Sequence, residues 1–183
     1  MKWIAIAVGV VVALIVLIVM IGSILPRDHV ATMSARISAP PARVWATITQ
    51  PDSFTMWRSD LTRVETLPAG PSGASWREHS RNGAMTMVVE SAESPKRMVT
   101  RIVDQNLPFG GRWEYDIEPD GPDASRVTIT ERGWVSNPIF RFVSRFVMGH
   151  TATIDAYLRA LGKHFGSEAT PTVIATTGAN HGV

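Results

Sequence analysis

The chain of 183 residues contains no cysteine, and this absence excludes disulfides, thiolate nucleophiles and cysteine-ligated zinc or iron–sulfur clusters. Its net charge is only +2 with histidine neutral, so the sequence indicates no large basic surface, and we expect no nucleic-acid partner. The G-x-S-x-G, H-E-x-x-H, Walker A and G-x-G-x-x-G motifs are missing as well. The five histidines, at positions 29, 79, 150, 164 and 181, lack metal-ligand spacing within any one element. The sequence therefore predicts neither a metal nor a cofactor.

One long hydrophobic run is present, and it extends from Trp3 to Leu25. It carries no charge and, as a helix rising about 1.5 Å per residue, would reach about 35 Å, enough to span a hydrocarbon core. The run predicts a transmembrane anchor over residues 1–26 and a single-pass protein of the cell membrane. A cleaved secretory signal is the alternative, but the apolar region of a signal is shorter, about 7–15 residues, and is followed by an Ala-x-Ala-like site that is missing here.

The charges that flank this run leave the side of the membrane open. Lys2 and the amino terminus favour an orientation with the N-terminus inside the cell, which would export the rest of the chain. Three basic residues beyond the run favour the opposite orientation, and these are Arg27, Arg36 and Arg43. The sequence decides neither orientation.

The remainder of the chain shows mainly the alternation of apolar and polar residues that is typical of β-strands. The predicted strands are His29–Ser38, Thr62–Leu67, Ala74–Ser80, Ala84–Ser91, Lys96–Val103, Gly111–Glu118 and Ser125–Trp134. Asn82-Gly83, between two of them, is a strong hairpin signal. In one strand Trp113, Tyr115 and Ile117 share a face opposite charged residues, which indicates an antiparallel sheet with one solvated side.

Helical spacing is found in three segments. Short helical segments are predicted over Pro41–Thr49 and Pro51–Trp57, both of which begin at a proline. A long amphipathic helix is predicted over Pro138–Phe165, and Gly149 is expected to weaken or kink its middle. Such a helix must cover one face of the sheet, so the predicted fold class is α+β. The Thr-, Ala- and Gly-rich residues 167–183 are predicted to form a disordered tail.

Three local patterns, at residues 37–45, 51–57 and 153–161, resemble the START-like superfamily, which includes polyketide cyclases/dehydratases and lipid-transfer domains. The similarity covers residues 29–166. The resemblance implies a helix-grip fold, in which a curved antiparallel sheet of about six to seven strands surrounds the long C-terminal helix and leaves a cavity between them. Residues 27–166 would then form a domain that binds a lipid or another hydrophobic small molecule. The N-terminal anchor departs from the common soluble form and favours a ligand drawn from a bilayer.

In this family geometry, some apolar residues that would otherwise be ordinary core residues line the cavity. Methionine and aromatic side chains suit an adaptable apolar pocket. The candidate ligand-binding residues are Trp76, Met85, Met87, Trp113, Tyr115, Phe142, Phe146, His150 and Tyr157. The segment Pro108–Gly111 is either a mobile lid or membrane-touching tip with an exposed Phe109, or a plain turn.

No catalytic residue is assigned, but two residues are candidates for proton transfer. His150 lies four residues after Phe146 and four before Ile154, hence on the apolar face of the predicted helix. There it would orient a ligand, act as a general acid or base, or serve as a buried structural histidine. Glu131 alternates in phase with apolar neighbours and so points to the core, where it would need a partner such as His150 or an arginine. A bulge at Gly133 would instead turn Glu131 to solvent.

Three functions are compatible with these features. The favoured hypothesis is a membrane-tethered domain that binds a lipid or other hydrophobic molecule between sheet and helix without transforming it. One version of this hypothesis adds transfer of the bound molecule. The second is a polyketide cyclase/dehydratase-like enzyme that uses His150 and Glu131. The third is an adaptor whose cavity is filled by side chains and whose surface binds a protein. The missing reaction motifs favour non-enzymatic binding, and the sequence identifies neither the ligand nor a protein partner.

Overall fold

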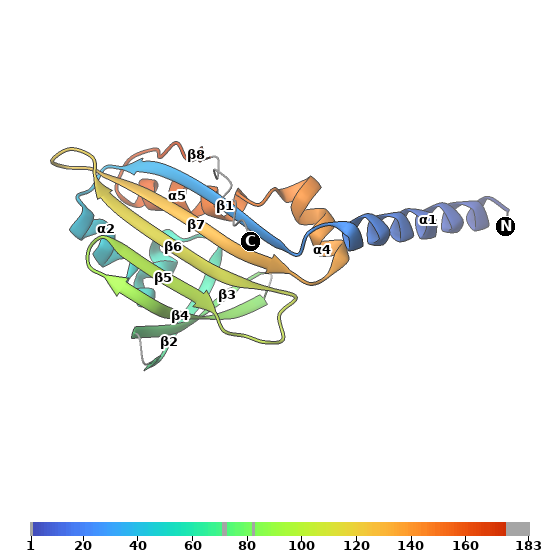
Figure 1. Cartoon of the computed structure of the whole chain (residues 1–183), viewed down its shortest axis with the longest axis horizontal. Coiled ribbons are helices and arrows are strands. Elements are labelled where there is room, and N and C mark those ends of the chain that lie inside the picture. The colour runs from blue at the N-terminus through green and yellow to red at the C-terminus, as the bar shows by residue number, and fades with distance from the viewer. Residues whose placement is uncertain (1, 71–72, 82, 175–183) are drawn as a thin grey trace, which may run out of the picture.

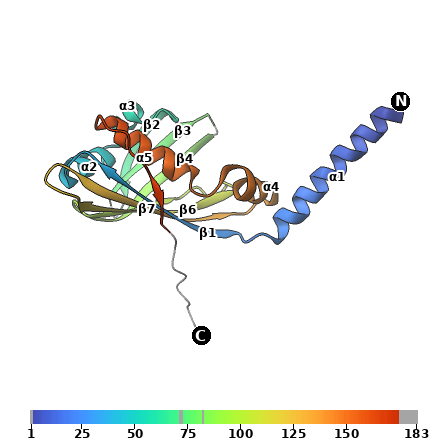
Figure 2. The same ribbon diagram turned by 90° about the horizontal axis from the view of Figure 1, so that it is seen from above.

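The structure is a computed structural model that describes residues 2–70, 73–81 and 83–174. Its first element is the helix α1 (Lys2–Ile24), which extends away from the rest of the chain (Figures 1 and 2). Within the described residues, α1 is the one helix that is long and apolar enough to cross a membrane. A secretory signal near the N-terminus would meet the same criteria of length and apolar composition.

The rest of the chain folds around one antiparallel sheet of eight strands. The strands are β1 (Asp28–Ile37), β2 (Leu61–Gly70), β3 (Gly73–Ser80), β4 (Gly83–Glu93), β5 (Arg97–Ile102), β6 (Phe109–Pro119), β7 (Ser125–Val135) and β8 (Thr172–Val173). Their order in the sheet is β2-β3-β4-β5-β6-β7-β1-β8, so that β1 pairs with β7. The predicted α+β class and the curved antiparallel sheet are confirmed, with eight strands in place of six to seven. β3 and β4 form the predicted hairpin, in which Ser80 pairs with Gly83.

The segment Pro108–Gly111, predicted to be a loop, largely belongs to the sheet. Phe109 begins β6 and pairs with Val135 of β7, although its side chain is exposed as expected. A Cβ added to Gly110 would lie 2.7 Å from the ring of Trp134, so a glycine lets this ring lie flat across β6. Gly110 is therefore explained by its contact with Trp134 within the sheet, whereas the sequence had suggested a turn at this glycine.

The helices of the domain lie on one side of the sheet (Figure 2). The segments α2 (Pro41–Ile48), η1 (Pro51–Ser53) and α3 (Phe54–Trp57) form where they were predicted, and α2 and η1 each have proline in the first turn. The last helix, α5 (Ala152–His164), packs against β1, β7 and α3. The sheet and α5 together enclose the core.

The long helix predicted over Pro138–Phe165 is divided into three parts. The helix α4 (Pro138–Val143) is followed by the π-helical turn η2 (Ser144–Met148), and α5 begins only at Ala152. Between them Gly149 has a φ of +77°, a left-handed conformation that residues with a side chain rarely adopt. The predicted weak point at Gly149 is confirmed, and it is strong enough to separate two helices and to turn α4 away from α5.

The tail predicted over residues 167–183 is ordered in its first part. Ala169 is buried against Gly162 of α5, and Thr172–Val173 form β8, which pairs with Met33 and Ser34 of β1. The prediction of disorder is therefore wrong for residues 167–174, because this segment adds a short edge strand to the sheet. The rest of that prediction, on residues 175–183, lies outside the described residues.

Candidate functional site

The concave face of the sheet is lined by residues whose positions follow from the strand registers. Trp113 of β6 lies between Thr100 of β5 and Glu131 of β7. Met87 of β4 lies between Trp76 of β3 and Ile102 of β5. Because side chains alternate between the two faces of a strand, these residues share the face that α5 covers. Among the candidates, alternation in the sequence predicted that Trp113 and Tyr115 share a face, and in the sheet they do.

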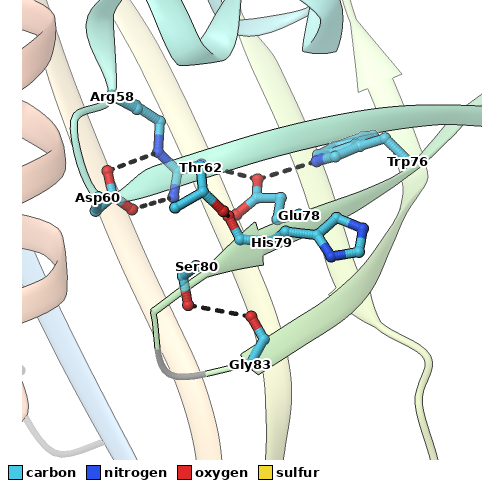
Figure 3. Close-up of polar contacts among 8 residues, drawn as sticks. All are labelled: Arg58, Asp60, Thr62, Trp76, Glu78, His79, Ser80 and Gly83. Atoms are coloured by element: carbon cyan, nitrogen blue, oxygen red, sulfur yellow. Dashed lines mark hydrogen bonds and ion pairs between the residues drawn. The ribbon is translucent and has the colours of Figure 1, made fainter.

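A buried ion cluster lies on this face, on the side of β2 and β3 (Figure 3). Arg58 follows α3 and is only 8% exposed, and Glu78 of β3 is 5% exposed. The Arg58 guanidinium donates to the Glu78 carboxylate through Nη1 at 2.8 Å and to Asp60 through Nη2 at 2.8 Å. The indole of Trp76 donates to the same Glu78 oxygen at 3.0 Å. We call Arg58, Trp76 and Glu78, together with the exposed Asp60 at their outer edge, the buried ion cluster.

The charges in the buried ion cluster compensate one another. Burial by itself lowers the pKa of Arg58, but the carboxylates of Glu78 and Asp60 outweigh it and raise the pKa above the ordinary value. The cation therefore stays charged and is fully engaged, so the cluster fixes the junction between α3 and β2 against β3 instead of offering a free charge to a ligand. Sequence reasoning missed this cluster, although Glu78 alternates in phase with Trp76, which was a candidate for the inner face.

An aromatic group connects the buried ion cluster to the centre of the face. Tyr157 of α5 lies beneath the Arg58 guanidinium, 5.4 Å from ring centroid to Cζ, and its ring centroid is 5.8 Å from those of Tyr115 and Trp113. Burial raises the pKa of Tyr157 and of Tyr115, so both hydroxyls remain protonated at neutral pH. The two tyrosine rings fill the middle of the face with neutral side chains, and Trp113 lies beside them.

Directly beneath α5 the space is filled. Ile154, Leu158 and Leu161 are each 0% exposed, and Tyr157 is buried beside them. The expected cavity under the whole C-terminal helix is therefore not found under α5, because this helix packs its apolar face onto the sheet. A surface hollow of about 460 Å³ lies elsewhere, beside η1 and α3, and its walls are Thr49, Gln50, Pro51, Asp52, Ser53 and Met56.

The concave face is incompletely covered at the end of the sheet where β1 begins. The antiparallel registers place the starts of β4 and β6 and the ends of β5 and β7 at this same end. We call it the anchor end because α1, the candidate membrane span, precedes β1. Met85, Ile102 and Trp113 point inward near this end and are only half-buried. We call these three residues the open end of the concave face. They are apolar side chains that the fold leaves without complete cover.

A histidine cluster lies next to Trp113 at the same end. His29 of β1 is 3.5 Å from Glu131 of β7, between Nε2 and Oε1, and its ring stacks on that of His150, with centroids 4.3 Å apart. The predicted approach of Glu131 and His150 is thus made through His29, which the sequence analysis did not select. We call His29, Glu131 and His150 the histidine cluster. Within the described part of the chain, no group of three or more acidic or histidine side chains is arranged to hold a metal ion.

Gly133 has a different role from the predicted bulge. The pairings of β7 with β1 and with β6 continue through this residue without a shift of register, so Glu131 keeps its inward direction and is half-buried. A Cβ added to Gly133 would lie 2.6 Å from Cε1 of His29. The glycine therefore makes room for the histidine ring against β7, and the single glycine near the end of this strand was the only signal for it in the sequence.

The histidine cluster leads to a prediction about pH. Burial, then the neighbouring His29 and Arg145, lower the pKa of His150 below its ordinary value of 6.5, against a smaller opposing effect of Glu131. The unfolded chain therefore binds a proton at this residue before the folded chain does, and the stability contributed by neutral His150 falls as the pH drops below 6.5. We expect an NMR titration of the full chain in detergent to give His150 a midpoint below 6.5, and the His29→Ala variant to raise it. A wild-type midpoint at or above 6.5 would contradict the observed packing.

The nine candidate ligand-binding residues do not form one wall. Trp76, Met87, Tyr115 and Tyr157 are buried in the core. Met85, Trp113 and His150 are half-buried at the anchor end, and Phe142 of α4 is half-buried as well. Phe146 of η2 is 59% exposed and contacts Phe142, with ring centroids 5.0 Å apart. The break at Gly149 moves this phenylalanine away from the line expected for a continuous helix.

The architecture of a curved antiparallel sheet with a C-terminal helix across it is that of the START-like proteins. A family model described as "Polyketide cyclase / dehydrase and lipid transport" matches residues 28–166, so the chain belongs to this family of ligand-binding domains. The comparison with curated proteins gave no significant match.

Solved structures share the fold at low sequence identity. A START superfamily protein from Mycobacterium smegmatis has a TM-score of 0.61 and 14% identity, covering 75% of this chain and 97% of its own. A conserved protein from Geobacillus kaustophilus has a TM-score of 0.64 and 13% identity, covering 78% and 99%. Norcoclaurine synthase from Thalictrum flavum, solved in complex with dopamine and hydroxybenzaldehyde, has a TM-score of 0.59 and 12% identity, covering 76% and 87%. At these identities the likeness establishes the fold.

Proposed function

We propose that α1 tethers this domain to a membrane and that the domain binds a lipid or another hydrophobic small molecule at the open end of its concave face, without transforming it. The observation that carries the proposal is the half-buried apolar surface of Met85, Ile102 and Trp113 at the anchor end. Exposed apolar surface on the inner face of a sheet is costly unless something covers it. A ligand taken from the bilayer would supply that cover.

The side chains around the open end suit an amphipathic molecule. Met85 and Trp113 offer a polarisable and an aromatic wall to an apolar chain. Beside them, the imidazoles of His29 and His150 have nitrogen atoms able to donate to or accept from a polar head group. The buried ion cluster and Tyr157 close the interior behind this region. The proposed ligand therefore has an apolar portion against the sheet and a polar portion at the histidine cluster.

The ligand is best tested by its recovery from the protein. We expect the full chain, extracted in a mild detergent, to retain a lipid or apolar molecule in native mass spectrometry. The variant Ile102→Glu should lose this molecule, because it places a carboxylate in the apolar wall. Arg101→Gln is the matched control, since Arg101 precedes Ile102 and is an exposed residue that pairs with Glu90. A ligand-free wild type, or an Ile102→Glu variant that keeps its ligand while still folded by circular dichroism, would contradict the proposal.

The histidine cluster favours a second candidate function, an enzyme that moves a proton on a bound molecule. A carboxylate and two imidazoles lie together there, and an imidazole can act as a general acid or base. The norcoclaurine synthase that shares this fold was solved with two small aromatic molecules. If the molecule recovered from the protein differs from the lipid supplied in mass or, as an isomer would, in chromatographic retention, and His29→Ala abolishes the difference, the enzyme is correct. If both mass and retention are unchanged, non-enzymatic binding is correct.

A further inference from the structure

The helix α4 is held against the C-terminal end of α1. A Cβ added to Gly22 would lie 1.9 Å from the carbonyl oxygen of Pro138, so the two backbones meet at a distance that only glycine permits. Arg141 of α4 is buried and donates to the carbonyl oxygens of Leu25 at 2.7 Å and Ser23 at 3.4 Å. These are carbonyls at the end of α1 that the helix itself leaves without a partner. The side chain of Arg141 therefore caps α1 and fixes α4 beside it.

The contact lies at a depth that a membrane would occupy. A hydrocarbon core of about 30 Å takes about 20 residues of helix, which corresponds to residues 3–22 of α1. α1 is exposed along its first part and becomes covered only at Ile18, Val19, Ile21, Gly22 and Leu25. Several of these covered residues fall inside the expected hydrocarbon span. If α1 crosses the bilayer, the element that covers them must reach into the bilayer as well.

The exposed apolar side chains of the domain gather at this same end. Among the described residues beyond α1, large apolar side chains are exposed at the anchor end at Val30, Phe109, Trp134, Ile139, Phe140, Phe146 and Val147. The exposed large apolar side chains elsewhere in that part of the chain are those of Met56, Val173 and Ile174. A concentration of exposed aromatic and aliphatic side chains beside a membrane span is typical of a surface that contacts the interface of a bilayer. Figures 1 and 2 both show α4 beside the end of α1.

We infer that α4 and η2 form a second membrane contact, in which Ile139, Phe140, Phe146 and Val147 insert into the interfacial region of the bilayer beside α1. Arg145 on η2 is exposed and is placed to meet anionic lipid head groups. The inference rests on the membrane tether of the proposed function. It adds that the open end of the concave face lies at the bilayer surface, because His150 is separated from η2 only by Gly149 and belongs to the histidine cluster. A lipid would then enter the site without crossing water.

The absence of native cysteine allows a direct measurement of depth. Single variants of the full chain, Phe140→Cys and Val147→Cys, carry a polarity-sensitive fluorophore in nanodiscs of phosphatidylcholine and phosphatidylglycerol, with or without a lipid that bears a quencher on its acyl chain. Val11→Cys in the middle of α1 reports insertion of the anchor, and Met56→Cys, at a position 76% exposed on α3, reports the domain surface. All four positions are exposed, so labelling leaves the core unchanged.

We expect labels at positions 140 and 147 to emit at shorter wavelength than the label at position 56 and to lose intensity when the quencher lipid is present. The label at position 56 should be unaffected. If the label at position 11 is quenched but those at positions 140 and 147 behave like position 56, the inference is wrong while the tether stands. Blue-shifted emission at positions 140 and 147 without quenching would indicate cover by a protein or a second copy, and would also overturn it. Without quenching at position 11, the tether and the inference both fail, whereas ligand recovery tests the binding site separately.

Discussion

The Arg58→Met variant is expected to destabilise the domain by about 3–5 kcal/mol, because it leaves the Glu78 carboxylate buried without its cationic partner. Glu78 is 5% exposed and would keep only the indole of Trp76 as a donor among the bonds observed. An uncompensated buried carboxylate must either remain charged at high cost or take up a proton. The loss should be measured by urea denaturation of the full chain in detergent.

A matched arginine outside the core serves as the control. Arg97 also contacts two carboxylates, those of Glu114 and Asp116, but on the exposed face of the sheet. The Arg97→Met variant should therefore cost no more than about 1 kcal/mol. The double variant Arg58→Met/Glu78→Leu should recover much of the stability lost by Arg58→Met, since it removes both charges. Equal losses of stability in Arg58→Met and Arg97→Met would show that the buried ion cluster does not hold the junction between α3 and β2 against β3.

Truncation of Leu158 in α5 to alanine is expected to cost about 2–5 kcal/mol, because a fully buried side chain is lost and a cavity remains. Leu158 is 0% exposed and lies between Ile154 and Leu161 on the face that α5 turns to the sheet. The measurement is again the urea midpoint of the full chain. Met56→Ala, at a 76% exposed position, should stay within about 0.5 kcal/mol of the wild type. A loss at Leu158 as small as that at Met56 would mean that the sheet does not grip α5.

Much of the sheet was predictable because alternation is a local signal. Each strand that the sequence indicated is present, and Trp113, Tyr115 and Glu131 point to the face that their parity implied. β8 was not predicted, since its two residues acquire strand geometry only by pairing with β1. Threonine- and alanine-rich composition could not distinguish such an edge strand from a disordered tail.

The elements of the site that the sequence did not reveal depend on contacts between distant residues. His29 begins a strand, and only the pairing of β1 with β7 places it between Glu131 and His150. Arg58 and Glu78 are separated in sequence and meet because the chain turns after α3. Similarly, the contact of Arg141 with the end of α1 joins segments more than a hundred residues apart. Periodicity gives the direction of a side chain, but tertiary structure selects its partner.

These contacts together describe a domain whose interior is closed under α5 and partly open at the anchor end. Leu158 and Tyr157 of α5 are buried, and the buried ion cluster lies beside them on the β3 side. The helix is interrupted at Gly149, α4 contacts α1, and Met85, Ile102 and Trp113 are half-buried at the anchor end. For these reasons the proposed ligand is placed at the anchor end and not in the region beneath α5.

The most direct test is photochemical labelling of the full chain in nanodiscs that contain a phospholipid with a diazirine on its acyl chain, followed by peptide mapping of the adducts. Binding at the open end of the concave face predicts adducts on Met85, Ile102 or Trp113 that an excess of unlabelled lipid removes. Adducts confined to α1 and α4, with the strands β4, β5 and β6 unlabelled, would contradict the account.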